Sequence, residues 1–142
     1  MLDKVVMDYR TRALMAVQTT ANAADDYLLP TAGAKSQVLR VVATMGNAAD
    51  LVLTPKTSDD AAGTNAAAIA EDVEIYVNGV RQTAAKAYTI GDATGNFVVD
   101  FVIPPQIIPA GKYIGMSYAN SNAANLMCAE LIEDVAYKPT VA

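Results

Sequence analysis

Hydrophobic and polar residues alternate with a period of two along much of the chain. The clearest run spans residues 97–103, where Phe97, Val99, Phe101 and Ile103 share one side and Asp100 lies on the other. This period places successive side chains on opposite faces of a β-strand. Pro104-Pro105 follows the run, and proline donates no N–H to a strand ladder. The pattern therefore predicts a strand over 97–103 with one wholly apolar face.

A tight turn is predicted inside residues 74–83, where two β-favouring runs flank Asn78-Gly79. This dipeptide tolerates positive φ at both central positions of a type I′ turn, the commonest connection in two-residue hairpins. In the first run, Ile75 and Val77 alternate with Glu74 and Tyr76. The segment therefore predicts a β-hairpin.

Further strands are predicted by similar alternation. They span residues 13–20, 36–44, 50–57, 87–90 and 112–118. Residues 10–17 could also be written as a helical turn. The run from Leu126 to Tyr137 fits either a helix face or a strand in which Glu133 is the one exception. We favour the strand, because the other strands need a sheet partner.

The strands and turns together indicate the fold class. About eight short strands separated by turn residues are typical of a two-sheet sandwich or jelly roll. We therefore predict an all-β, jelly-roll-like antiparallel β-sandwich. Residues 13–142 form its single domain, and residues 1–12 form an N-terminal arm.

Composition narrows the range of functions. The chain has 142 residues and a net charge of −5, and its ten Lys and Arg residues are scattered rather than clustered. This distribution argues against nucleic-acid binding, which needs a basic patch. No apolar stretch approaches the roughly 20 residues of a membrane span, and the start of the chain does not resemble a signal peptide. We therefore expect neither a nucleic-acid nor a membrane partner.

Residue usage also argues against most catalytic sites. The chain has no His and one Cys, Cys128. Zinc sites and Ser-His-Asp triads require residues that are missing here. Cys128, between Met127 and Ala129, is interpreted as a small buried hydrophobic residue. We predict a protein that is not an enzyme and needs no cofactor.

Carboxylates are the remaining candidates for chemistry. Asp59 and Asp60 lie in a polar loop with Ser, Thr and Asn, which could supply oxygen ligands for calcium. The ligand spacing of an EF-hand is missing, and a solvated acidic loop is the alternative interpretation. A glycosidase pair is disfavoured because the chain has no Trp to stack against sugars.

Tyrosines suggest possible contact points. Tyr supplies an apolar ring and a polar tip, and it is enriched at protein interfaces. Most of the seven tyrosines fall in predicted strands. Tyr9 and Tyr27 do not, so we predict that these two contact a partner.

Three segments resemble the small cement, or decoration, proteins of tailed bacteriophage capsids. After an initial Met-Leu-Asp, the chain has a strand running into an acidic loop over Leu51–Asp60. A Pro-Ala-Gly turn then leads into an aromatic strand over Ile108–Tyr118, and the run Leu126–Asp134 follows. The resemblance covers about residues 36–137 and consists of strand and turn patterns.

The resemblance implies a protein that binds the outer surface of the phage head and stabilises contacts between coat subunits. It implies a homotrimer whose partner is the major capsid protein, located on the virion after assembly in the bacterial cytoplasm. The N-terminal arm would make contacts through apolar residues, namely Leu2, Val5, Val6, Met7 and Tyr9. The alternatives are a receptor-binding or carbohydrate-binding module of a fibre, and a tail or connector subunit.

Overall fold

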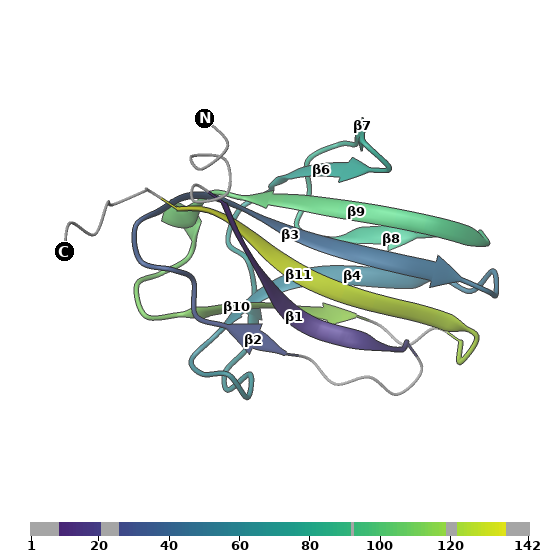
Figure 1. Ribbon diagram of the computed structural model, residues 1–142, viewed down its shortest axis with the longest axis horizontal. Helices are drawn as coiled ribbons and strands as arrows, with labels where there is room; N and C mark the ends of the chain where they lie inside the picture. Colours follow the sequence, from purple (N-terminus) through teal and green to yellow (C-terminus); the bar gives the residue numbers. More distant parts are fainter. Residues whose placement is uncertain (1–8, 21–25, 92, 119–121, 136–142) are drawn as a thin grey trace.

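Two antiparallel sheets make up the fold of the computed structural model (Figure 1). The structure describes residues 9–20, 26–91, 93–118 and 122–135, and these contain eleven strands. The strands are β1 (Tyr9–Thr19), β2 (Tyr27–Leu28), β3 (Ala34–Met45), β4 (Leu51–Ser58), β5 (Ala67–Ala68), β6 (Glu74–Val77), β7 (Val80–Arg81), β8 (Tyr88–Ile90), β9 (Gly95–Ile103), β10 (Tyr113–Tyr118) and β11 (Asn125–Val135). A 3₁₀ turn, η1 (Pro105–Ile107), follows β9.

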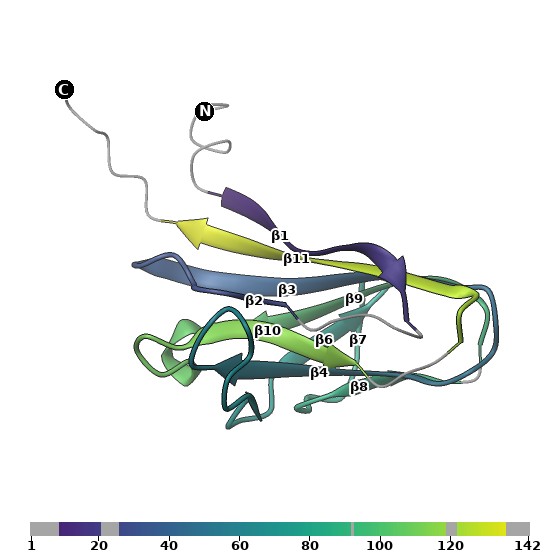
Figure 2. The same cartoon turned by 90° about the horizontal axis from the view of Figure 1, so that it is seen from below.

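Figure 2 shows the two sheets as separate layers, one above the other. The first, which we call sheet A, has the strand order β1-β11-β3-β9-β6-β7. The second, sheet B, has the order β2-β10-β4-β5, and β8 also pairs with β4. The chain remains in one sheet only at the β4–β5 and β6–β7 connections, and every other connection between consecutive strands passes from one sheet to the other.

The predicted all-β sandwich is confirmed. Three of the strands in the described ranges, β2, β5 and β7, have two residues each, which leaves eight longer strands. The ambiguous C-terminal run is β11, which pairs with β1 on one side and β3 on the other. These tertiary pairings outweigh the helical propensity of its residues. The finer jelly-roll assignment stays a prediction.

Residues 9–12, part of the predicted N-terminal arm, lie in strand β1. β1 begins at Tyr9, and the backbone of residues 9–12 pairs with residues 131–134 of β11. The alternative of a helical turn over 10–17 is wrong, because the same residues lie in this strand. Sheet pairing, rather than the local pattern, sets the start of the element.

The predicted hairpin over residues 74–83 is confirmed. β6 and β7 pair in register on either side of a two-residue turn. Asn78 has φ 49° and Gly79 has φ 79°, so both central residues adopt positive φ as a type I′ turn requires. The Asn78 side-chain oxygen also accepts a hydrogen bond from the Val98 N–H at 2.9 Å, which ties the turn to β9.

The core lies between the facing sides of the two sheets. On β9, the alternation predicted from the sequence buries Val99, Phe101 and Ile103, and each has 0% of its surface exposed. Large buried side chains from both layers meet there. From sheet A they are Leu39, Ile75, Phe101, Met127 and Leu131, and from sheet B they are Leu51, Leu53, Ile90, Ile114 and Met116.

Two glycines make room for the ring of Tyr27. Gly115 lies opposite Tyr27 in the β2–β10 pair. A Cβ atom at residue 115 would overlap both this ring and the carbonyl oxygen of Asp26, and one at Gly63 would lie 2.7 Å from the Tyr27 Cε2. Only a residue without a side chain allows such a close approach. Gly115 therefore permits β2 to join sheet B.

We expect Gly115→Ala to lower the free energy of unfolding by about 1–3 kcal/mol, because overpacking forces backbone shifts. The measurement is urea-induced unfolding monitored by circular dichroism. Gly91→Ala is the control, since the nearest atom to a Cβ at that position is 3.8 Å away. Equal stabilities of the two variants would contradict the close packing of β2 on β10.

Candidate functional site

The outward side of sheet A carries a group of apolar side chains. They alternate with the core residues along β11, β3 and β9, and β1 adds one at the sheet edge. Val17 is 69% exposed, Leu126 is 40% exposed and Val42 is 37% exposed. We define the apolar outer face by these residues and their half-exposed neighbours: Val17, Val42, Val98, Leu126 and Cys128.

Strand register brings these side chains together. Val42 of β3 lies opposite both Cys128 of β11 and Val98 of β9. Directly opposite residues on one face of an antiparallel pair are in contact range. The apolar outer face is therefore continuous across three neighbouring strands.

Two shallow hollows mark this surface. One has a volume of about 270 Å³ and the other of about 140 Å³, and Val17, Val42 and Cys128 line both. Large exposed apolar patches on soluble proteins often mark interaction sites. Side chains of a complementary protein surface could fill these two hollows.

An ion pair borders the apolar outer face. Arg40 of β3 donates two hydrogen bonds to Asp100 of β9, with Nε–Oδ1 2.7 Å and Nη2–Oδ2 3.0 Å. The hydrogen bonds to Asp100 raise the pKa of the Arg40 guanidinium above its usual value. Bidentate pairing holds both side chains in one geometry. The face thus has a fixed polar border beside its apolar centre.

The prediction that Cys128 is buried is wrong. Its side chain alternates with buried Met127 and Ala129, so it lies on the outward side of β11 with intermediate exposure. A small apolar residue suits either side of a strand, so its immediate neighbours in sequence could not decide its position.

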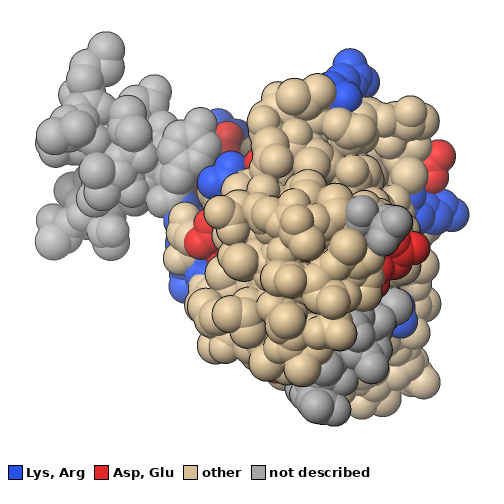
Figure 3. All heavy atoms as spheres, turned by 90° about the vertical axis from the view of Figure 1, so that its right-hand side faces the viewer, with Lys and Arg blue, Asp and Glu red and all other residues tan. Residues whose placement is uncertain are grey.

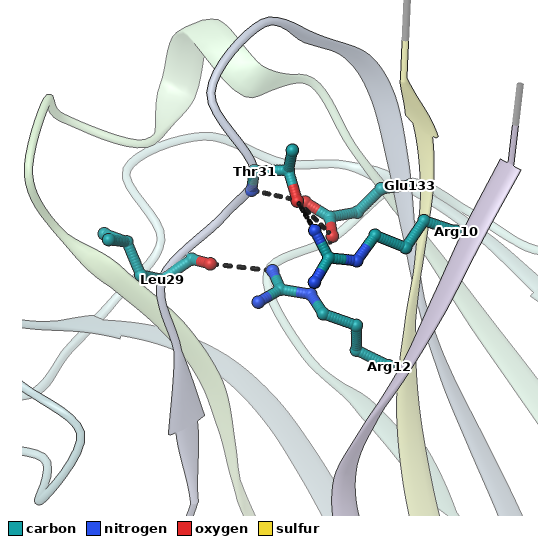
Figure 4. Close-up of polar contacts among 5 residues, drawn as sticks. All are labelled: Arg10, Arg12, Leu29, Thr31 and Glu133. Atoms are coloured by element: carbon teal, nitrogen blue, oxygen red, sulfur yellow. Dashed lines mark hydrogen bonds and ion pairs between the residues drawn. The ribbon is translucent and has the colours of Figure 1, made fainter. Parts of the chain in front are cut away.

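A second cluster of polar residues lies where β1 and β11 run side by side (Figure 4). Glu133 is 0% exposed. Its Oε1 accepts hydrogen bonds from Arg12 Nε at 2.8 Å and Thr31 Oγ1 at 2.9 Å, and its Oε2 accepts one from the Thr31 N–H. Arg12 Nη2 also donates to the Leu29 carbonyl at 2.7 Å, and Arg10 Nη1 donates to Thr31 Oγ1 at 3.4 Å.

This cluster has a structural role in the geometry observed. Both carboxylate oxygens of Glu133 have hydrogen-bond partners, so the buried charge is compensated. The bonds attach the segment after β2 to the β1–β11 pair, which belongs to the other sheet. In the sequence, Glu133 is the one charged residue in the apolar series of the run from Leu126 to Tyr137. This interruption of the alternation is the signal that indicates a buried polar site.

The acidic loop at Asp59 and Asp60 is organised by its own hydrogen bonds. Asp59 pairs with the Lys112 ammonium and accepts a hydrogen bond from Asn65 Nδ2 at 2.7 Å. Asp60 accepts from Thr64 Oγ1 at 2.7 Å and from the Thr64 and Ala62 N–H groups, each at 3.0 Å. Calcium binding at this loop would have to compete with these contacts.

The same contacts affect the titration of the two carboxyls. The hydrogen bond from Lys112 holds the pKa of Asp59 below its ordinary value, and the hydrogen bond from Asn65 makes a smaller contribution in the same direction. The hydroxyl and N–H of Thr64 lower the pKa of Asp60. Within the described residues, no group of three or more acidic, His or Cys side chains is arranged to hold a metal ion.

The predicted contact residues are only partly placed by the structure. Tyr27 is 4% exposed, because its ring packs against Gly63 and Gly115 inside its own domain. The prediction that it contacts a partner is therefore corrected. Tyr9 lies in β1 rather than outside the strands, but its side chain is not among the parts that the structure describes. The predicted arm contacts Leu2, Val5, Val6 and Met7 lie outside the described residues.

The end of the sandwich shown in Figure 3 has a different character. Its centre is uncharged, and the Lys, Arg, Asp and Glu side chains visible in this view lie around the rim.

In the described part of the chain, no helix has the length and hydropathy that crossing a bilayer requires. Comparison of the chain with protein-family models, curated proteins and solved structures finds no match.

Proposed function

We propose that this chain is a non-enzymatic structural protein that packs against other protein subunits through the apolar outer face of sheet A. The observation that carries the proposal is the exposure of Val17, Val42 and Leu126 side by side on the outward side of sheet A. Leaving these side chains in water is unfavourable, and covering them with a partner recovers about 25 cal/mol per Å² of apolar area.

The more specific role is that of a cement protein on the outside of a phage head, where it stabilises contacts between coat subunits. This role rests on the resemblance of segments 51–60, 108–118 and 126–134 to capsid decoration proteins. The partner is then the major capsid protein, and the chain acts as a homotrimer on the virion surface. A sandwich with an apolar outward sheet face is compatible with such a role.

The test is co-sedimentation of the purified chain with empty shells assembled from the coat protein encoded in the same genome. We expect the chain to bind shells, and we expect Val42→Glu to weaken this binding at least tenfold. The reason is that a carboxylate buried without a partner in an apolar contact is strongly unfavourable. Tenfold corresponds to about 1.4 kcal/mol.

Val80→Glu is the matched control. Val80 is 64% exposed and lies on β7, at the opposite edge of sheet A from β1. This variant is expected to bind shells as the unchanged chain does. Equal weakening by both variants, or no binding to shells at all, would contradict the proposal. Analytical ultracentrifugation that gives a monomer at every concentration would contradict the trimer.

A further inference from the structure

A cleft of about 480 Å³ opens between two loops at the end of the sandwich where β3 begins and β9 ends. In Figure 1 this is the left-hand end. One wall comes from residues 29–34, which lead into β3, and the other from residues 105–112, which join β9 to β10. Its apolar lining includes Leu29, Pro30, Pro105, Ile108 and Pro109.

Gln37 of β3 lies at the bottom of this cleft. It is 1% exposed, and it is the one lining residue in the buried class. Neither its Nε2 nor its Oε1 has a hydrogen-bond partner among the described residues. Buried polar atoms nearly always have partners, and leaving one unsatisfied is costly. The Gln37 amide therefore lacks both an acceptor for its N–H groups and a donor to its oxygen.

Several other polar groups around the cleft already have hydrogen-bond or ion-pair partners. The N–H groups of Ala34, Ile108 and Lys112 donate to carbonyls within their own turns, at 3.2, 3.1 and 3.1 Å. The Lys112 ammonium pairs with Asp59, and the prolines have no N–H to offer. Glu133, which lies opposite Gln37 in the β3–β11 pair, is occupied by Arg12 and Thr31.

We propose that this cleft binds an extended peptide segment of another protein. A Gln side chain presents an N–H donor and a carbonyl acceptor, and this pair complements the C=O and N–H of a peptide backbone. The apolar walls formed by Pro30, Ile108 and Pro109 would take an aliphatic side chain of the same segment. The volume falls within the range of about 300–1,000 Å³ found for ligand pockets.

This site is independent of the apolar outer face. Gln37 lies on the inward side of sheet A, whereas Val42 lies on the outward side of the same strand. Failure of peptide binding would leave coat binding through the outer face intact, and the converse also holds.

The test uses N-acetyl-leucine N′-methylamide as the probe, titrated into the ¹⁵N-labelled full chain and followed by NMR. We expect the side-chain NH₂ signals of Gln37 to move saturably, together with the backbone signals of Ala34 and Ile108. The corresponding methyl ester lacks one N–H donor and is expected to bind at least tenfold more weakly. Gln37 signals that do not move would overturn the proposal.

Two variants separate recognition from folding. Gln37→Met keeps the length of the side chain and removes both polar atoms, so we expect at least tenfold weaker probe binding and a higher melting temperature. Gln106→Met is the matched control, because Gln106 is exposed in η1 and does not line the cleft. Undiminished binding by Gln37→Met would overturn the proposal. N-methylacetamide binding as tightly as the leucine probe would overturn the assignment to a peptide.

Discussion

Phe101→Ala is expected to lower the free energy of unfolding by about 3–5 kcal/mol, the range for removing a buried aromatic side chain. Phe101 is 0% exposed on the inward side of β9, opposite Leu39 of β3 and Ile75 of β6. Its removal leaves a cavity between neighbouring strands that are held in register on both sides. The surrounding backbone can therefore relax only slightly, and the full cost of the cavity remains.

The measurement is chemical denaturation monitored by circular dichroism, with Phe97→Ala as the control. Phe97 is the other Phe of the chain, and it lies on the same face of β9 but near the strand end, where it is half-buried. We expect this variant to lose less than half as much stability. Equal losses would contradict the placement of Phe101 at the centre of the core.

Glu133→Ala is expected to lower the free energy of unfolding by about 3 kcal/mol, because removing one partner of a buried ion pair leaves the other uncompensated. The change removes the acceptor of Arg12 and the two acceptors of Thr31. The Arg12 side chain is 22% exposed and can regain some water, so the loss should stay toward the lower end of the range for buried pairs.

A double-mutant cycle identifies the source of this loss. Arg12→Ala combined with Glu133→Ala is expected to cost less than the sum of the two single changes, because the two side chains interact directly. Glu130→Ala is the matched control on the same strand, since Glu130 points outward and is half-exposed. We expect it to change stability by less than about 0.5 kcal/mol, as is usual for surface positions. Additive losses at residues 12 and 133 would contradict the coupling.

The parts of the fold that sequence could predict are those encoded by nearby residues. The alternation in β9 and the Asn78-Gly79 turn each act within a few residues, so their local pattern decides the outcome. β11 is an intermediate case, because its own residues allow a helix and only the need for sheet partners favours the strand. The two-residue strands are too short to show any period.

The polar sites depend on contacts that are distant in sequence. Glu133 meets Arg12 across 121 positions and Thr31 across 102 positions, so their meeting requires the register of the sheets. Tyr27 was expected at a partner surface because no local strand pattern surrounds it. Its burial depends on Gly63 and Gly115, which are far along the chain. The unpaired amide of Gln37 likewise becomes apparent only when residues 29–34 and 105–112 form the two walls of the cleft.

The pairing of β1 with β11 has a consequence for the order of events during synthesis. β1 is translated before every other strand that the structure describes, and its one strand neighbour in sheet A is β11, the last of them. β1 therefore cannot pair with its neighbour, and its apolar residues stay exposed, until β11 has been translated. Such long-range closure slows folding. We expect nascent chains that end before β11 to engage chaperones, and the sandwich to form only after release of the C-terminal strand.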